Sequence, residues 1–115
     1  MNAMSWDEAV ATLEGRALAN ATALLAVLEV AEYLASSRYA RSLVPAVDGD
    51  ALLLRTRADA GELQIRFDAG AHRFVFTHRP RPGDPRPWMR ECEAGEWQPV
   101  LERVFHKRLH WFHEG

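Results

Sequence analysis

The first third of the chain carries apolar side chains at helical spacing, and its start has the form of a capped helix. The Ser5 hydroxyl is placed to accept a hydrogen bond from the backbone N–H of Glu8, whose carboxylate can accept from the serine N–H. This capping box predicts that a helix begins at Ser5. Glycine costs about 1 kcal/mol relative to alanine inside a helix, so Gly15 indicates either a kink or two helices, near 5–14 and 16–37.

Beyond Pro45 the apolar period changes to two residues, which is typical of strands with one buried face. Three alternating runs, at 51–57, 62–68 and 72–77, are joined by turn-forming residues and predict an antiparallel meander. A register error of one residue would scatter the apolar set over both faces, so the core face is well defined. That face collects Leu52, Leu54, Leu63, Ile65, Phe67, Phe74 and Phe76.

The connections between the three runs also predict cross-strand partners. They pair Leu54 with Ile65, and Ile65 with Phe74. On the opposite face the same register places Arg66 directly across from Arg73. Like charges that face each other across a strand pair are unfavourable, so an anionic partner would offset the cost.

The segment after the meander changes character twice. Four prolines within 79–87 exclude a central strand or a helix and predict an exposed Arg/Pro loop. A second hairpin is expected from 88–93 and 96–98. Pro99 suits the first position of a helix, and 99–113 has apolar residues on one side and polar residues on the other.

These elements predict one α+β domain over 1–115, with residues 1–4 disordered. An N-terminal helix and a C-terminal helix would pack on the same face of an antiparallel meander of three to five strands. The length of 115 residues, with 48% hydrophobic and 26% charged residues, suits a single core and argues against an intrinsically disordered chain.

The run Gly61-Glu62-Leu63-Gln64-Ile65-Arg66-Phe67, followed by a turn and a further strand, is similar to the meander of the frataxin family. The order of elements resembles that family's architecture as well. Frataxins carry a dense acidic ridge on the first helix and first strand, whereas the acidic residues here are scattered around the helix. The resemblance therefore implies a shared shape without iron binding. Small secretion chaperones and toxin-neutralising proteins have compatible shapes, so the fold alone does not fix the function.

The charge pattern points to an acidic partner rather than to nucleic acid or a membrane. The net charge of −2 argues against binding either of the latter through bulk charge. Residues 51–90 nevertheless carry eight arginines, and arginine suits bidentate contacts with carboxylates. The aromatic side chains of the predicted sheet face the core, whereas RNA-reading sheets expose them. We expect an acidic protein to bind the outer sheet face and the Arg/Pro loop through Arg55, Arg57, Arg66, Arg73, Arg81, Arg86 and Trp88.

An alternative prediction is a metal or small-molecule site on the last helix. His106 and His110 have the i, i+4 spacing that lets two imidazoles share a metal ion. Arg108 falls among apolar positions, where it needs either a carboxylate of the first helix or an anionic ligand in a pocket. The weak metal-ligand candidates on the polar side of this helix are Glu102, His106, His110 and His113.

Catalytic chemistry has no recognisable motif in the chain. There is no Gly-x-Ser-x-Gly sequence and no glycine-rich loop that opens a helix, so we expect no catalytic residue and no cofactor. The single cysteine, Cys92, excludes an intramolecular disulfide and a cysteine-based zinc site, and it fits a reducing, cytoplasmic setting.

The N-terminus, the longest apolar stretch and the tryptophans bear on export, membrane insertion and self-association. The N-terminal residues are acidic where a signal peptide is basic, so we do not expect export by a signal peptide. Glu29 and Glu32 interrupt the longest apolar stretch, so no membrane span is expected. Four tryptophans and a first helix that is apolar on more than one side favour a homodimer or a stable complex. The sequence therefore predicts a small non-catalytic protein-interaction module, of the adaptor, secretion-chaperone or toxin-neutralising type.

Overall fold

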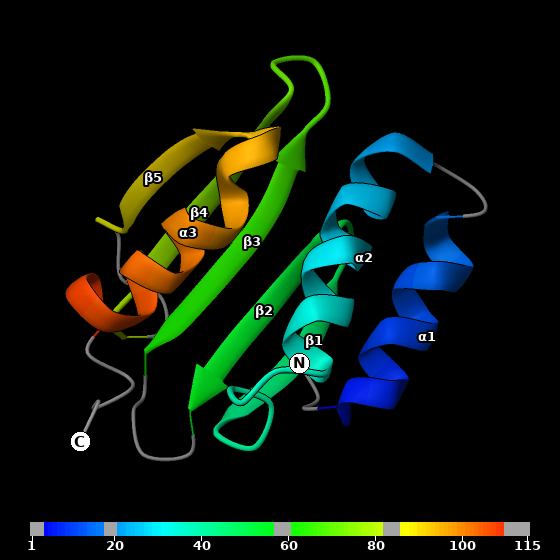
Figure 1. The fold of residues 1–115 in the computed structure, drawn as a ribbon, viewed down its shortest axis with the longest axis horizontal. Coiled ribbons are helices and arrows are strands. Elements are labelled where there is room, and N and C mark those ends of the chain that lie inside the picture. The colour runs from blue at the N-terminus through cyan, green and yellow to red at the C-terminus, as the bar shows by residue number, and fades with distance from the viewer. Residues whose placement is uncertain (1–3, 18–20, 57–60, 82–85, 110–115) are drawn as a thin grey trace.

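The computed structural model describes residues 4–17, 21–56, 61–81 and 86–109. Two helices come first, five strands follow, and a helical segment closes the described chain (Figure 1). In chain order the elements are α1 (Trp6–Ala17), α2 (Ala21–Ala35), β1 (Leu43–Asp48), β2 (Ala51–Thr56), β3 (Glu62–Asp68), β4 (Arg73–Arg79), β5 (Trp88–Glu93), the 3-10 turn η1 (Ala94–Glu96), α3 (Trp97–Arg103) and the π-helical turn η2 (Val104–Arg108).

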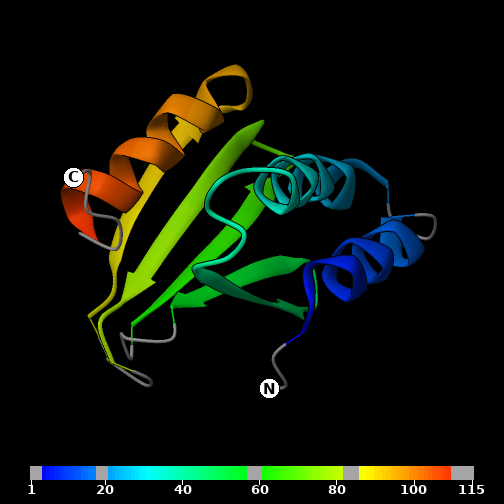
Figure 2. The ribbon, with the colours of Figure 1, turned by 60° about the horizontal axis from the view of Figure 1, so that its bottom comes forward.

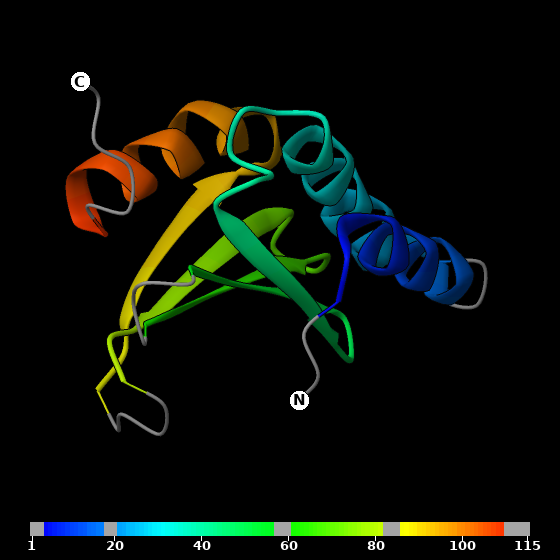
Figure 3. The same cartoon turned by 90° about the horizontal axis from the view of Figure 1, so that it is seen from below.

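The five strands form one antiparallel sheet with the order β1-β2-β3-β4-β5, so each strand pairs with its neighbours in the sequence. The helices lie on one face of this sheet: α2 contacts β2 and β3, α1 packs on α2 and β1, and α3 contacts β5 (Figure 2, Figure 3). We call the opposite side of the sheet the outer face. The predicted α+β class, with both helical ends on one sheet face, is confirmed.

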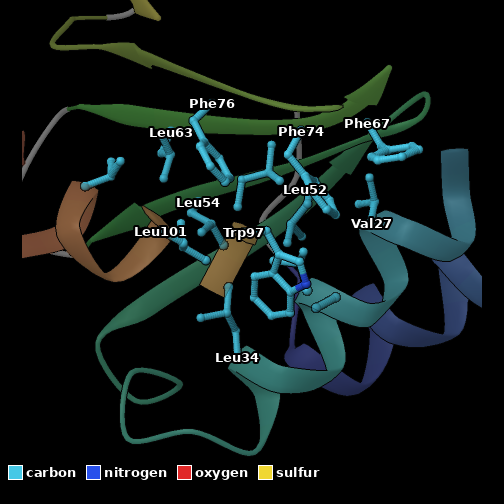
Figure 4. Close-up of a cluster of buried hydrophobic side chains, with 14 of the residues drawn as sticks. Val27, Leu34, Leu52, Leu54, Leu63, Phe67, Phe74, Phe76, Trp97 and Leu101 are labelled. Carbon is cyan, nitrogen blue, oxygen red and sulfur yellow. The ribbon is translucent and has the colours of Figure 1, made fainter. Parts of the chain in front are cut away.

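The core lies between the sheet and the helices. All seven apolar side chains that the alternating pattern assigned to one face are buried. Figure 4 shows sheet residues such as Phe76 and Leu54 in one cluster with Leu34 of α2 and Leu101 of α3. Aromatic and branched aliphatic side chains of the sheet therefore pack against both helical ends of the chain, which are far apart in the sequence.

The capping box at the start of α1 is confirmed. The Ser5 Oγ accepts a hydrogen bond from Glu8 N at 3.1 Å, and Glu8 Oε1 accepts one from Ser5 N at 3.4 Å. Gly15 lies inside α1, and a Cβ added there would meet no atom within 4 Å. The chain does form two helices, which is one of the two predicted alternatives, but the division comes later than Gly15: α1 continues to Ala17, and α2 begins at Ala21.

The strand register differs from the predicted one by two residues at both hairpins. Leu54 lies opposite Leu63 rather than Ile65, and Ile65 lies opposite Phe76 rather than Phe74. A shift by two leaves every side chain on its own face, because side chains alternate with a period of two. The core was therefore predicted correctly although the cross-strand partners were not.

The turn between β3 and β4 explains the second shift. His72 has a left-handed φ of 56° and belongs to the turn, so β4 begins one residue later, at Arg73. Asp68 Oδ1 accepts a hydrogen bond from Ala71 N at 3.2 Å, and Asp68 lies opposite Arg73. Aspartate caps of this kind stabilise a turn locally, but the sequence does not say which turn residue takes the positive φ.

Strand β1 was not predicted as a separate element. It pairs with β2 through the tight turn at Gly49, whose φ of 61° favours glycine. The signal was present in the sequence, because Gly49-Asp50 between two apolar runs is a two-residue hairpin pattern. Pro45 obscured it, since proline is excluded from central strands. β1 is an edge strand, where proline is tolerated.

The C-terminal helical segment begins earlier than predicted. Residues 96–98 form no strand, because η1 runs directly into α3 at Trp97. Pro99 therefore lies in the first turn of the helix rather than at its first position. Backbone N–H groups in the first turn have no intrahelical acceptor, so the missing N–H of proline costs no helical hydrogen bond there. At Val104 the helix widens into a π-helical turn, and Leu109 N donates to Val104 O at 2.9 Å.

Two boundaries of the predicted domain map differ in detail. Met4, expected in a disordered N-terminus, is described, is partly buried and donates its N–H to Pro45 O at 2.9 Å. Arg79, expected in the Arg/Pro loop, belongs to β4. Residues 1–3 and 82–85, which complete those two predicted segments, lie outside the described residues.

Candidate interaction surfaces

The outer face carries Arg55, Arg66 and Arg73 from the predicted binding set, but each of these three has an acidic neighbour. Arg55 donates from Nε and Nη2 to Glu62 Oε2, at 3.1 and 2.8 Å. Arg66 Nε lies 3.7 Å from Asp50 Oδ1. The surface charge of these arginines is therefore offset locally.

The predicted contact between Arg66 and Arg73 is absent, and that prediction is wrong. In the observed register Arg66 faces Val75, and Arg73 faces Asp68 on one side and Glu93 on the other. The two-residue shift replaces a like-charge pair by opposite charges. The cost that an anionic partner was expected to offset does not arise.

A hollow of about 520 Å³ opens on the outer face, near the ends of β3 and β4. Met89, which is 58% exposed, contributes to its lining. Thr77 in its floor is only 7% exposed. Its lining on the strands comprises Arg66, Phe67, Asp68, Val75, Thr77 and Met89.

Among the remaining predicted partner-binding residues, Trp88 does not share a face with these arginines. Trp88 lies opposite His78, on the side of the sheet that carries the helices. Arg81 and Arg86 are exposed at the two ends of the Arg/Pro loop. Arg57 lies outside the described residues. The outer face and Trp88 are thus separated by the thickness of the sheet.

A groove runs between β5 and the C-terminal helical segment, and we call it the edge groove. Its volume is about 180 Å³. Figure 1 shows α3 alongside β5, the last strand of the sheet. Trp88, Val100 and Val104 supply apolar surface, and three cationic side chains surround it. The full lining is Trp88, Arg90, Val100, Arg103, Val104 and Lys107.

The three cations of the edge groove have no carboxylate within ion-pair distance among the described residues. Arg103 and Lys107 stand one helical turn apart, a spacing at which like charges destabilise a helix by about 0.2–0.5 kcal/mol. The π-helical turn carries Val104 and Lys107, and such turns are frequent at functional sites. The local charge pattern is thus one that a bound anion would stabilise.

Part of this groove could be predicted from the sequence. Arg103 and Lys107 fell on the polar side of the predicted last helix, at i, i+4 spacing. Their position beside Arg90 depends on β5 being the edge strand next to α3, which is a property of the whole sheet. Local patterns could not show that these three side chains line one groove.

Two of the metal-ligand candidates on the last helix, Glu102 and His106, are engaged by tyrosines. Tyr33 Oη donates to Glu102 Oε1 at 2.6 Å, and Tyr39 Oη lies 3.2 Å from His106 Nε2. The hydrogen bond to Glu102, together with burial and the negative charge of that carboxylate, raises the pKa of Tyr33 to about 12. Trp97 packs edge-on against Tyr33, with ring centroids 5.4 Å apart.

The other candidates for a metal or anion site are not placed by the structure. His110 and His113 lie outside the described residues, and so does the side chain of Arg108. Within the described part of the chain, no three His, Cys, Asp or Glu side chains are grouped so as to hold a metal ion. Burial raises the pKa of the Cys92 thiol, and the charge of Glu96 acts in the same direction. The alternative function therefore stays a prediction.

Comparison with protein families, with curated proteins and with solved structures gives no match for this chain. Among the described residues, no helix is long and apolar enough to cross a membrane.

Proposed function

We propose that this chain is a non-catalytic protein-interaction module that binds an acidic segment of a partner protein in the edge groove. The observation that carries the proposal is the ring of Arg90, Arg103 and Lys107 around an apolar floor. Carboxylates would form charge-assisted hydrogen bonds with these cations, and an apolar side chain would cover the valines. An adaptor, a secretion chaperone or a toxin-neutralising protein would use such a site, in a cytoplasmic setting.

The size and shape of the groove favour a peptide segment over a small molecule. Pockets for small ligands usually enclose about 300–1,000 Å³, and the edge groove holds about 180 Å³. A groove of this size can take one or two side chains of a larger partner.

The charge around the groove favours a protein over nucleic acid. Glu91 and Glu93 lie on the other side of β5, so the basic surface does not continue across the strand. Nucleic-acid sites instead follow a phosphate backbone with an extended basic track. The net charge of −2 agrees with this choice.

The proposal is tested by selection from a displayed library of random linear peptides. We expect the wild-type protein to recover sequences enriched in Asp or Glu beside apolar residues, and the Arg103→Glu variant to lose that enrichment. The substitution creates a Glu–Lys pair at i, i+4 with Lys107, which supports the helix, so loss of binding would not reflect unfolding. Arg41→Glu is the matched control, because Arg41 is an exposed arginine outside the groove.

Two results would overturn the proposal. One is recovery of acidic peptides by Arg103→Glu as efficient as by the wild type. The other is failure to enrich acidic peptides while a fluorescent oligothymidylate binds the wild type and not Arg103→Glu, which would assign the groove to nucleic acid.

We also propose, separately from peptide binding, that the protein forms the homodimer predicted from its tryptophans. Trp97 is buried in the core, and Trp6 Nε1 donates to Ala40 O at 3.0 Å, so both already serve the fold. The support for a second copy is Leu25 on α2, whose side chain is 53% exposed. Sedimentation equilibrium tests this part, and a monomeric mass for the wild type would remove it.

A further inference from the structure

We propose that the partner segment binds as a sixth strand along the edge of β5 that faces away from β4, with acidic residues at alternate positions facing the edge groove. This inference rests on the proposed function and specifies its binding mode. Strand addition supplies main-chain hydrogen bonds for affinity and uses alternate side chains for specificity.

The two edges of the sheet differ in how they are protected. On β1, Pro45 has no N–H to offer, and its carbonyl accepts from Met4 N at 2.9 Å. On β5, no proline interrupts Trp88–Glu93, and the described residues pair with it only from β4. The edge strand of a sheet is a template for a further strand.

The two sides of β5 carry opposite charge. Trp88 and Arg90 face the helices, because they lie opposite the buried His78 and Phe76. Met89 and Glu91 face outward, opposite Thr77 and Val75. Side chains directly across a strand pair share a face, so an added strand meets cations on one side and carboxylates on the other.

The edge groove lies where an added strand would place its helix-facing side chains. Neighbouring strands are about 4.8 Å apart, so these side chains would stand beside Arg90 and under Arg103 and Lys107. Carboxylates are favoured there. At the positions between them, carboxylates would face Glu91 and be repelled. The chemistry of β5 therefore selects acidic residues at i and i+2 and disfavours them at i+1.

Two synthetic peptides of equal composition test this pattern. The first is Thr-Glu-Thr-Glu-Thr-Val-Thr-Val, which presents both glutamates and both valines on one face of a strand. The second is Thr-Thr-Glu-Glu-Val-Val-Thr-Thr, which divides them between the two faces. By fluorescence anisotropy of labelled peptides, we expect the alternating peptide to bind about tenfold more tightly, a difference that composition and net charge cannot produce.

The outcomes separate this inference from the proposed function. Equal affinity for the two peptides, lost in Arg103→Glu, would overturn strand addition and leave recognition of acidic segments intact. Failure of the wild type to bind either peptide would contradict both. Tighter binding of the alternating peptide, lost in Arg103→Glu and kept in Arg41→Glu, supports both.

A variant of β5 itself supplies the matched control. Glu91→Lys replaces the outward carboxylate by a cation, so we expect it to raise the affinity for the divided peptide more than that for the alternating peptide. N-methylation gives a second readout, because an added strand uses the backbone amides of alternate residues only. Methylating one alternate set should abolish binding and the other set should be tolerated; equal effects of the two sets would contradict strand addition.

Discussion

Single side chains set the polar links between the two helical ends of this protein. Tyr33 from α2 reaches Glu102 in α3, and Tyr39 after α2 reaches His106 in η2. Neither link follows from a sequence pattern, because the partners are separated by 69 and 67 residues. The sequence did place Glu102 and His106 on the polar side of their helix. In the structure both side chains are partly buried, and each lies within hydrogen-bond distance of a tyrosine hydroxyl.

The Tyr33–Glu102 hydrogen bond predicts a late phenol titration. The pKa of Tyr33 is raised from 10.0 to about 12, because the neutral phenol donates to the Glu102 carboxylate. The folded state therefore holds this proton more tightly than the unfolded state, and the stabilisation is present below pH 10 and lost as pH rises through about 12. Ultraviolet titration of phenolate should show a late transition that Tyr33→Phe removes.

Glu102→Gln separates the carboxylate from burial as the cause. It keeps the side-chain shape but removes the charge, so the late transition should move to lower pH. The Tyr39→Phe variant should retain the late transition. An unchanged titration in Glu102→Gln would contradict the assignment.

Among the elements, the sheet shows which level of structure a single sequence can predict. Alternation fixed the buried face of three strands, and the loop lengths suggested partners that were wrong by two residues. The face depends on the period alone, whereas the register depends on turn geometry such as the positive φ of His72. Capping is equally local, which is why the start of α1 was predicted correctly.

The register predicts the sign of a charge substitution. In the structure Arg73 lies between Asp68 and Glu93, so Arg73→Glu places three carboxylates in a row. We expect a loss of unfolding free energy of a few tenths to about 1 kcal/mol for each pair. In the predicted register the same change would have created an attractive pair with Arg66.

Urea denaturation of Arg73→Glu and the wild type checks this sign. Arg81→Glu is a matched control, since Arg81 is exposed and lies outside the strands. If the unfolding free energy of Arg73→Glu were higher than those of the wild type and of Arg81→Glu, the observed pairing would be contradicted.

At the scale of the whole molecule, the helices cover one sheet face and leave two surfaces with distinct chemistry. Among the described residues, the arginines of the outer face lie beside carboxylates, whereas the three cations of the edge groove have no carboxylate within ion-pair distance. The sequence placed the basic binding surface on the sheet, because it could count arginines but not their neighbours. Which side chains neutralise each other is decided by strand order and helix position, and these emerge only from the assembled fold.

The measurement that tests the central claim most directly is an amide chemical-shift map of isotope-labelled protein titrated with the alternating peptide. We expect the largest changes along β5, at Met89 to Cys92, and in the facing helical segment from Val100 to Lys107. The β1 edge, from Val44 to Val47, should change little. Changes concentrated at β1 or in the outer hollow around Arg66 and Val75 would contradict the assignment of the edge groove as the binding site.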